Sequence, residues 1–449
     1  MSADTICAIA TAPGGALSII RISGDQSLEI LSRIFSKDVR CAQPYTIHYG
    51  HIADFDEVLV SVFRAPHSYT GEDSAEISCH GSRYILNKVL ELLISNGCRM
   101  ANPGEFTMRA YLNGKMDLSQ AEAVADLIAS TNQATHQLAM SQLRGGISSE
   151  LDKLREQLLK LTSLLELELD FSDHEELEFA DRSELKDLAN IIDKQITRLA
   201  HSFEIGQAIK QGIPVAIVGK TNVGKSTLLN ALLKDDRAIV SDIHGTTRDT
   251  IEDTIDIQGV TFRFIDTAGI RQTTDKVERI GIQRTFQAMH KARIVLWLID
   301  TEPTPDEAKV ILEEIKDKSL VVIHNKIDKQ NIEITPNSDL HKYTNVKISA
   351  KSGIGLDQLE KAIFEAANIP TITDSDVIIT NARHYESLIH AQHNLSRVLS
   401  GLNTSSVSGD LLAEDLRLVL SDLAEITGKG QITTNEVLEN IFTHFCVGK

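Results

Sequence analysis

Hydrophobic patterning divides the chain into stretches of different character. Over roughly the first 117 residues, short apolar β-type runs are mixed with a single helical stretch at 83–94. The β-type runs lie at residues 17–22, 58–63 and 75–78. Glycine and proline interrupt them at Pro13-Gly-Gly and Pro103-Gly, as is typical of turns. This pattern predicts a small N-terminal α+β domain.

From Ser119 onward the pattern becomes helical. Ser119-Gln-Ala-Glu122 has the form of a capping box, which predicts that a helix starts there. Leucines then recur at positions 151, 154, 158, 161 and 165, the spacing of a helix–helix seam. A second helical segment is expected from 183 to about 203. The acidic residues between the two segments indicate a solvated connector, with a carboxylate metal site as the alternative: Asp170, Asp173, Glu175, Glu176 and Glu178.

From residue 213 to about 368 strand and helix patterns alternate. The expected strands lie at 213–218, 261–265, 294–299, 320–323 and 346–349. They are rich in β-branched residues and lack internal alternation, as buried parallel strands do, so a doubly wound α/β sheet is predicted. Further helices are expected at 384–399, at 410–426 and from about 434. Because helical segments flank the α/β unit on both sides, we infer one helical domain with an inserted α/β domain.

Composition and charge exclude several classes of protein. The chain has 449 residues and a net charge of −18, which argues against non-specific coating of nucleic acid. A local patch or a partner could still contact RNA. The five cysteines contain no CxxC pair, so neither a disulfide framework nor a zinc ribbon is expected. No basic leader precedes the first apolar residues, and no apolar run approaches eighteen residues. A cytoplasmic protein without a membrane segment is therefore expected.

A phosphate-binding motif lies between the first α/β strand and the helix that follows it. Gly219-Lys-Thr-Asn-Val-Gly224-Lys225-Ser226 matches the P-loop pattern. Its glycines allow backbone N–H groups to face phosphate oxygens, Lys225 neutralises phosphate charge, and the Ser226 hydroxyl is suited to Mg²⁺.

Motifs that follow the later strands identify the base. In Asn325-Lys-Ile-Asp328, the carboxylate can accept hydrogens from both N1 and the 2-amino group of guanine, which adenine does not offer. Ser349-Ala-Lys351 follows the last strand and can close over the base. Asp266-Thr-Ala-Gly269 is placed to hold Mg²⁺ through water and to sense the γ-phosphate. The segment 241–248 has the composition of a nucleotide-dependent switch.

These motifs together predict GTP as the ligand. The candidate GTP-binding residues are Asn222, Val223, Gly224, Lys225, Ser226, Thr227, Ser241, Asp242, Ile243, His244, Gly245, Thr246, Thr247, Asp266, Thr267, Ala268, Gly269, Asn325, Lys326, Asp328, Ser349, Ala350 and Lys351. In Ras-like proteins a glutamine after the Asp-x-x-Gly element orients the attacking water, but here that position is Ile270. Either hydrolysis is slow or another group acts, and Glu278 is the nearest carboxylate downstream. Arg248 is a candidate arginine finger, although a solvated arginine is the simpler interpretation.

Motifs outside the G domain carry a family resemblance over essentially the whole chain. They are the opening stretch 4–15, Arg21-Ile-Ser-Gly, Pro103-Gly-Glu-Phe-Thr, the stretch 113–123 and the terminal Phe445-Cys-Val-Gly-Lys. With them the chain resembles the MnmE (TrmE) family of tRNA-modification GTPases. The resemblance implies an N-terminal folate-binding and dimerisation domain at 1–117, helical segments at 118–211 and 371–449, and a Ras-like G domain at 212–370.

The resemblance also implies an activity and its partners. Family members hydrolyse GTP and act with an FAD-containing flavoprotein of the MnmG type. Together they add an aminomethyl or carboxymethylaminomethyl group to C5 of the wobble uridine of certain tRNAs. The one-carbon unit comes from 5-formyl- or 5,10-methylene-tetrahydrofolate. A homodimer that joins the flavoprotein in a heterotetramer is therefore expected.

Site residues follow from the same resemblance, position by position. Folate binding is implied for Arg21, Glu76, Lys115 and Lys449. K⁺ ligation is implied for Asn222, Ser241, Ile243 and Thr246, and Mg²⁺ ligation for Ser226 and Thr247. Glu278 matches the residue that activates water, and Cys446 matches a cysteine whose role stays open. The chain departs from the family pattern at Lys220-Thr221, at Val447 and at Met108, where a basic residue near the folate site is common.

Two other functions remain open at this stage. A GTP-dependent ribosome-assembly or switch protein would use the N-terminal domain only for docking and would not bind folate. A folate-dependent methyltransferase acting alone would form product without a flavoprotein, and its G domain would be purely regulatory.

Overall fold

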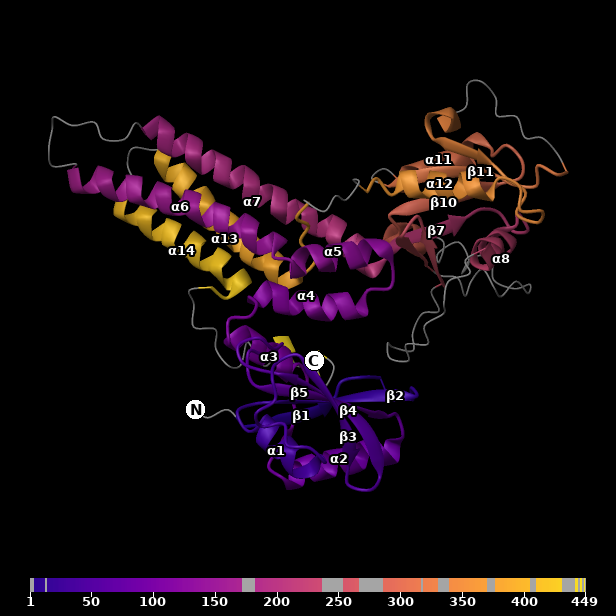
Figure 1. Cartoon of the computed structure of the whole chain (residues 1–449). Helices are drawn as coiled ribbons and strands as arrows, with labels where there is room; N and C mark the ends of the chain where they lie inside the picture. Colours follow the sequence, from indigo (N-terminus) through magenta and orange to yellow (C-terminus); the bar gives the residue numbers. More distant parts are fainter. Residues whose placement is uncertain are drawn as a thin grey trace. The chain divides into compact units, whose positions relative to one another are not determined.

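The computed structural model describes most of the chain, in two compact units. The described residues are 4–12, 14–171, 182–235, 253–265, 286–315, 318–329, 339–369, 376–403, 409–429, 441–442, 445 and 448. One unit comprises Met1–Ala129, Gln142–Ile196 and Glu386–Lys449, and the other Ser130–Ser141 and Thr197–Tyr385. An α+β sheet, a set of long helices and an α/β sheet are present, which confirms the predicted multidomain fold class (Figure 1).

The N-terminal sheet has six strands in the order β3-β4-β5-β2-β1-β6. The strands are β1 (Ile6–Ile9), β2 (Leu17–Ser23), β3 (Thr46–Ile52), β4 (Asp56–Phe63), β5 (Ser74–His80) and β6 (Arg99–Met100). All neighbouring pairs are antiparallel except β1 and β6. Helices α1 (Ser27–Ile34) and α2 (Arg83–Ser95) bury alternate strand residues on one face. The opposite face carries Arg21 and Glu76 among exposed side chains.

The prediction of one helix in this region was wrong. Besides α2, the sheet is accompanied by α1 and by α3 (Glu105–Leu112), each eight residues long. In α3 the polar Glu105 and Arg109 are buried along with Phe106, so the sequence shows no apolar stripe. Ion pairs rather than amphipathic patterning allow this helix to be buried.

Further helices precede and follow the α/β sheet in the sequence, and they are divided between the two units. They are α4 (Leu118–Ala129), α5 (Gln133–Leu143), α6 (Gly146–Phe171), α7 (Arg182–Gln211), α13 (Ala382–Asn403) and α14 (Gly409–Thr427). Helices α6 and α14 pack side by side (Figure 1). The predicted leucine seam is confirmed, since the leucines at 151, 154, 158, 161 and 165 of α6 are all buried.

The predicted cap of α4 was displaced by two residues. The helix starts at Leu118, and Asp117 rather than Ser119 caps it. Asp117 Oδ1 accepts from the Gln120 N–H, and Gln120 Oε1 accepts from the Asp117 N–H, both at 3.0 Å. The Ser119 hydroxyl instead donates to Asp117 Oδ1. A buried hydroxyl, that of Ser148, also donates to Asp117, and this contact from distant sequence favours Asp117 as the cap.

The second sheet has the order β12-β11-β10-β7-β9-β8. Its strands are β7 (Ile213–Val218), β8 (Asp253–Ile257), β9 (Val260–Phe264), β10 (Ile294–Ile299), β11 (Ser319–His324) and β12 (Thr344–Lys347). Among the described residues, the helices of this unit include α8 (Lys225–Asp235), α11 (Pro305–Glu314) and α12 (Leu356–Ala366), with the 3-10 turn η1 (Asp339–Lys342). All pairs are parallel except the β8–β9 hairpin.

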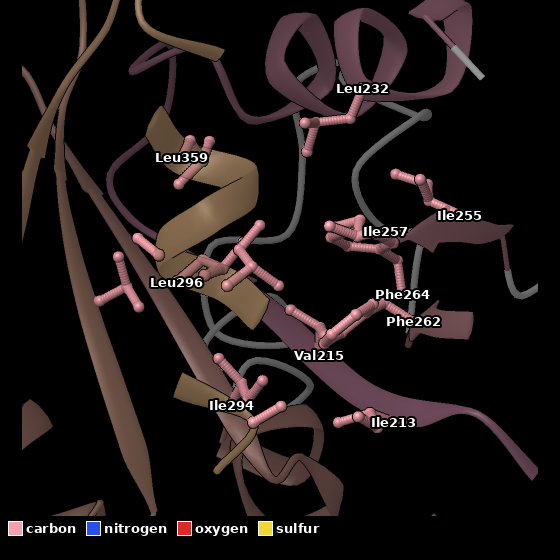
Figure 2. Packing of buried hydrophobic residues seen from close by; sticks show 14 of the residues in the cluster. Ile213, Val215, Leu232, Ile255, Ile257, Phe262, Phe264, Ile294, Leu296 and Leu359 are labelled. Carbon is pink, nitrogen blue, oxygen red and sulfur yellow. The ribbon is translucent and has the colours of Figure 1, made fainter. Parts of the chain in front are cut away.

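The central strands β7, β10 and β11 are buried on both faces, as the absence of alternation predicted. Residues of β8 and β9 alternate between buried and more exposed positions, and Val346 is the one buried residue of β12. Figure 2 shows one face, where strand side chains such as Val215 and Leu296 meet Leu232 of α8 and Leu359 of α12. Alternate residues of β10, including Trp297, pack into a second cluster. The antiparallel edge strand β8 was not predicted, because its Asp-Thr-Ile-Asp-Ile sequence is partly polar. The last strand ends at Lys347, two residues earlier than expected.

Among the helices within the described ranges, none combines the length and the apolar character needed to cross a membrane.

Candidate functional site

The P-loop joins β7 to α8 at the carboxyl edge of the second sheet. Gly219 and Gly224 have φ angles of +151° and +108°, in the region that favours glycine. A Cβ at Gly219 would lie 2.4 Å from the Leu298 carbonyl oxygen, and one at Gly224 would lie 2.4 Å from Asn325 Nδ2. Both positions therefore require glycine, and the loop keeps its backbone N–H groups available for an anion.

Lys225 is held inside its own loop. Its Nζ donates to the carbonyl oxygens of Gly219 and Lys220, each at 2.7 Å. Burial lowers the pKa of the Lys225 ammonium. A phosphate in the loop would oppose that effect, because a nearby anion favours the charged form. The lysine is thus positioned where phosphate would bind, with neutral carbonyl partners that an anion can replace.

Asn325 connects three loops at this edge of the sheet. Its Nδ2 donates to the Val223 carbonyl oxygen at 2.8 Å, and its Oδ1 accepts from the Ala350 N–H at 3.0 Å. The side chain is buried. The P-loop, the loop after β11 and the loop after β12 are therefore held together by one amide group.

Asp328 is oriented by its neighbour Ser349. The Ser349 hydroxyl donates to Asp328 Oδ1 at 2.7 Å. This hydrogen bond holds the pKa of the Asp328 carboxyl below its usual value. An ionised carboxylate here can accept two hydrogens from a base edge, as guanine recognition requires.

The structure brings together the described part of the predicted nucleotide site. Asn222 and Val223 lie in the P-loop, Ser226 and Thr227 in the first turn of α8, and Lys351 follows Ala350. Other predicted residues lie outside the described residues: Ser241, Asp242, Ile243, His244, Gly245, Thr246, Thr247, Arg248, Asp266, Thr267, Ala268, Gly269, Ile270, Glu278, Cys446 and Lys449. Asp173, Glu175, Glu176 and Glu178 of the acidic connector are outside as well. Within the described ranges, no group of three or more His, Cys, Asp or Glu residues could hold a metal ion.

A second site lies on the open face of the N-terminal sheet. Arg21 of β2 is paired with Glu76 of β5, and Arg21 Nε and Nη2 donate to Glu76 Oε1 at 3.0 and 2.8 Å. Arg21 Nη1 donates to the carbonyl oxygen of Gly448 at 3.2 Å. The guanidinium carbon lies 5.4 Å from the centroid of the Tyr69 ring and 5.6 Å from that of Phe106. Gly448 thus contacts an arginine that lies beside two aromatic rings.

Lys115 was predicted in the same site but has a different partner. Its Nζ donates to the Pro66 carbonyl oxygen at 2.9 Å, and the side chain is exposed. Lys115 also lines a cavity of about 720 Å³, together with residues of the α3–α4 connection, α6 and the end of α14.

Buried charges fix α3, which carries Phe106, against the N-terminal loops. Arg109 Nη1 lies 3.2 Å from both carboxylate oxygens of Glu72, and Nη2 lies 3.0 Å from Glu105 Oε1. Asp4 and Arg99 complete the network. This network positions one of the two rings beside Arg21.

Sequence reasoning missed several residues at these sites. Tyr69, Phe106 and Gly448 contact Arg21 through chain segments far apart in sequence, and no local signal marks them. Asp300, which pairs with Lys326 at 2.6 Å, does carry a signal. It directly follows β10, at the sheet edge where the nucleotide motifs also lie.

Comparison with known proteins finds matches along the whole chain. The family model described as the MnmE helical domain matches residues 118–446, and that of the GTP-binding protein TrmE N-terminus matches residues 5–115. A tRNA modification GTPase MnmE of Bacteroides thetaiotaomicron is 55% identical over 469 residues, covering 100% of both chains. One of Flavobacterium psychrophilum is 50% identical over 462 residues, covering 99% of each.

Two similar solved structures each cover part of the chain. The G domain of the T. maritima FeoB iron transporter is 23% identical with a TM-score of 0.24, covering 34% of this chain and 98% of that one. A GTP-binding protein from Sulfolobus solfataricus in complex with GDP is 21% identical with a TM-score of 0.23, covering 48% of this chain and 67% of that one.

Proposed function

The chain belongs to the MnmE family of tRNA-modification GTPases, and from this premise we propose the reaction in which its GTPase activity is used. The protein acts with a flavoprotein of the MnmG type, which carries FAD. Together they attach an aminomethyl or carboxymethylaminomethyl group to C5 of the wobble uridine of certain tRNAs. Tetrahydrofolate, as the 5-formyl or 5,10-methylene form, supplies the one-carbon unit. GTP hydrolysis drives a conformational cycle, since GTP phosphates have no place in that carbon transfer.

The observation that carries the folate proposal is the Arg21–Glu76 pair. Arg21 occupies only Oε1 of Glu76, and Oε2 accepts no hydrogen bond within the described part of the chain. A pterin presents a 2-amino-pyrimidinone edge whose donors suit a free carboxylate oxygen. The Tyr69 ring beside Arg21 is 36% exposed and offers flat surface for a planar heterocycle, while the buried Phe106 ring supports the guanidinium of Arg21. The donor set of this site therefore fits a reduced folate.

The C-terminal tail and Lys115 are proposed to contribute positive charge to the same ligand. Lys449 follows Gly448, whose carbonyl accepts from Arg21. The exposed ammonium of Lys115 has only a neutral carbonyl partner among the contacts above. Cations suit the carboxylates of a glutamyl tail.

At the nucleotide site, the described residues fit the proposed ions. Ser226 places a hydroxyl in the first turn of α8, directly after Lys225, and is proposed with Thr247 for Mg²⁺. The Asn222 side chain is exposed and makes no hydrogen bond within the described ranges, so its amide oxygen is available to a cation. We assign it to K⁺ with Ser241, Ile243 and Thr246. Bound K⁺ would supply the positive charge that an arginine finger supplies elsewhere, and Glu278 is proposed to activate water.

A homodimer is supported by exposed apolar side chains on the open sheet face. Ile47, Tyr49 and Leu59 are 67%, 57% and 45% exposed, and Leu17 is 68% exposed. Strand register places Leu59 and Leu17 on the face that also carries Arg21. Clustered apolar surface of this kind marks an interaction site. We propose that two copies pair through this face and bind the flavoprotein as a heterotetramer.

We also propose the domain division 1–117, 118–211, 212–370 and 371–449. The two sheets lie in separate units, and long helices occupy the sequence between and after them. Because its tRNA substrate is cytoplasmic, the protein is proposed to act there. The relatives are named as tRNA-modification proteins, which favours this function over ribosome assembly.

Isothermal titration with 5-formyl-tetrahydrofolate tests the folate proposal. The wild-type chain should bind, and Glu76→Gln should weaken binding at least about tenfold, because the carboxylate that accepts the pterin hydrogens is lost. Glu57→Gln is the matched control. It removes a carboxylate from the same sheet face, where Glu57 bonds Tyr49 rather than Arg21. No binding by the wild type, or equal binding by Glu76→Gln, would contradict the proposal.

A further inference from the structure

The lysine of the guanine-recognition motif contacts the P-loop as well as an acidic residue. Lys326 Nζ donates to the Asn222 carbonyl oxygen at 2.9 Å and forms an ion pair with Asp300 Oδ2 at 2.6 Å. Asp300 directly follows β10, which lies between β7 and β11 in the sheet. Three consecutive strand ends are therefore joined through one ammonium group.

The backbone of Asn222 has a left-handed conformation, which asparagine adopts more readily than most residues with a side chain. Its φ angle is +61°. Lys326 itself has a φ of +66°. Such residues keep this conformation when neighbouring contacts fix them. The hydrogen bond from Lys326 is a contact of that kind, because it holds the Asn222 carbonyl and so fixes the backbone from which the amide side chain extends.

Asp300 determines where the ammonium group lies. A lysine ammonium is a compact charge on a flexible four-carbon stem, so its position depends on fixed acceptors. Asp300 provides a charged acceptor that is 26% exposed, against 32% for Lys326. Without this carboxylate, Nζ would retain a neutral carbonyl partner and gain freedom to move toward water.

We propose that Asp300, acting through Lys326, is a positioning residue for Asn222 as a K⁺ ligand. This inference rests on the K⁺ use proposed above. It predicts that guanine-nucleotide binding and K⁺ binding strengthen each other, since the element that recognises the base also orients a K⁺ ligand. Such coupling is reciprocal: K⁺ raises the affinity for nucleotide by the factor by which nucleotide raises the affinity for K⁺.

A purely structural role for the pair makes a different prediction. Ion pairs with this degree of exposure contribute little to stability. If the Asp300–Lys326 pair only held two loops together, its loss would leave the K⁺ dependence of the protein unchanged. The K⁺ response therefore separates the two roles.

The test uses the full-length chain with Asp300→Asn, Asp300→Glu and a matched control. Glu307→Gln is the control, because Glu307 pairs at 2.8 Å with another P-loop lysine, Lys220, away from Asn222. Two quantities are measured against K⁺ concentration at constant ionic strength with Na⁺. One is the GTP hydrolysis rate, and the other is the affinity for a fluorescent non-hydrolysable GTP analogue.

Asp300→Asn should raise the half-saturating K⁺ concentration at least threefold in both measurements, with the hydrolysis rate at saturating K⁺ within twofold of wild type. Asp300→Glu should restore part of the response, and Glu307→Gln should match wild type. In an Asn222→Ala background, Asp300→Asn should cause no further change.

Two results would overturn the inference, and they are distinguishable. In the first, the wild type responds to K⁺ but Asp300→Asn has the same half-saturating K⁺ concentration. This result would refute the positioning role alone. Equal behaviour of the wild type in K⁺ and Na⁺ would refute K⁺ use itself and the inference with it.

Discussion

Replacement of Arg109 by methionine should destabilise the N-terminal domain strongly. The Arg109 side chain is 8% exposed and faces three carboxylates, those of Glu72, Glu105 and Asp4. Methionine fills part of the space without supplying charge. The carboxylates would then remain in place without the cation that holds α3 against the sheet.

The size of the destabilisation depends on which partners each carboxylate keeps when Arg109 is replaced. Removing one partner of a buried ion pair costs about 3–5 kcal/mol. Glu105 keeps its pair with Arg99 at 2.7 Å, and Asp4 is 58% exposed and loses little. Within this network, the Glu72 carboxylate keeps only the hydrogen bond that the Ser23 hydroxyl donates to it at 2.7 Å. The low end of the range, about 3 kcal/mol, is therefore expected, which is roughly a 100-fold change in the opening equilibrium.

Hydrogen–deuterium exchange of the full-length chain resolves this effect by region. Peptides from α3 and from β5 should exchange roughly 100-fold faster in Arg109→Met, because exchange of protected amides follows the local opening equilibrium. Arg40→Met is the control. Arg40 is 55% exposed and pairs with Asp38 on the surface, so its loss should leave the exchange of these peptides unchanged.

The pH dependence gives a second readout of the same network. Burial raises the pKa of Glu105, but hydrogen bonds from Arg99, the Asn102 N–H and Arg109 outweigh burial and hold it below its usual 4.5. Folding therefore favours the ionised form, and this stabilisation is present above pH 4.5 and is lost as pH falls below it. In the wild type, the protection of the α3 and β5 amides from exchange should decline as the pH falls below 4.5. In Arg109→Met this decline should be less steep. Exchange in Arg109→Met within twofold of wild type at neutral pH would refute the reasoning.

Two further substitutions test the nucleotide site and the helical seam. Asn325→Ala leaves the Val223 carbonyl and the Ala350 N–H without partners at about 1–3 kcal/mol each, so GDP affinity measured by calorimetry should fall at least about tenfold. An unchanged dissociation constant would contradict this role. Leu158→Ala should lower the free energy of unfolding of the helices by about 2–5 kcal/mol, whereas the adjacent, exposed Leu159→Ala should have little effect in the same urea titration. Equal effects of the two would show that the seam is not the packed core.

Features determined by local chemistry could be predicted from the sequence. The strands β7 and β10 were placed correctly because both of their faces are buried, which removes alternation. The P-loop follows β7 and the Asn325 motif follows the parallel strand β11, so their meeting at one sheet edge was expected. The described parts of these loops lie together through Asn325.

Features determined by distant contacts could not be predicted. The Arg21–Glu76 pair depends on the register of β2 against β5, and the contact of Arg21 with Gly448 joins opposite ends of the chain. Helix α3 has no apolar stripe because ion pairs compensate its buried charges.

The central claim is that this GTPase modifies the wobble uridine of tRNA with a folate-derived carbon. Mass spectrometry of tRNA nucleosides, from cells with and without the gene, tests it most directly. The account predicts that 5-aminomethyl- and 5-carboxymethylaminomethyl-type uridines are lost without the gene. Wild type should restore them and Glu76→Gln should not. Wobble uridines that are unchanged in the absence of the gene would contradict the account.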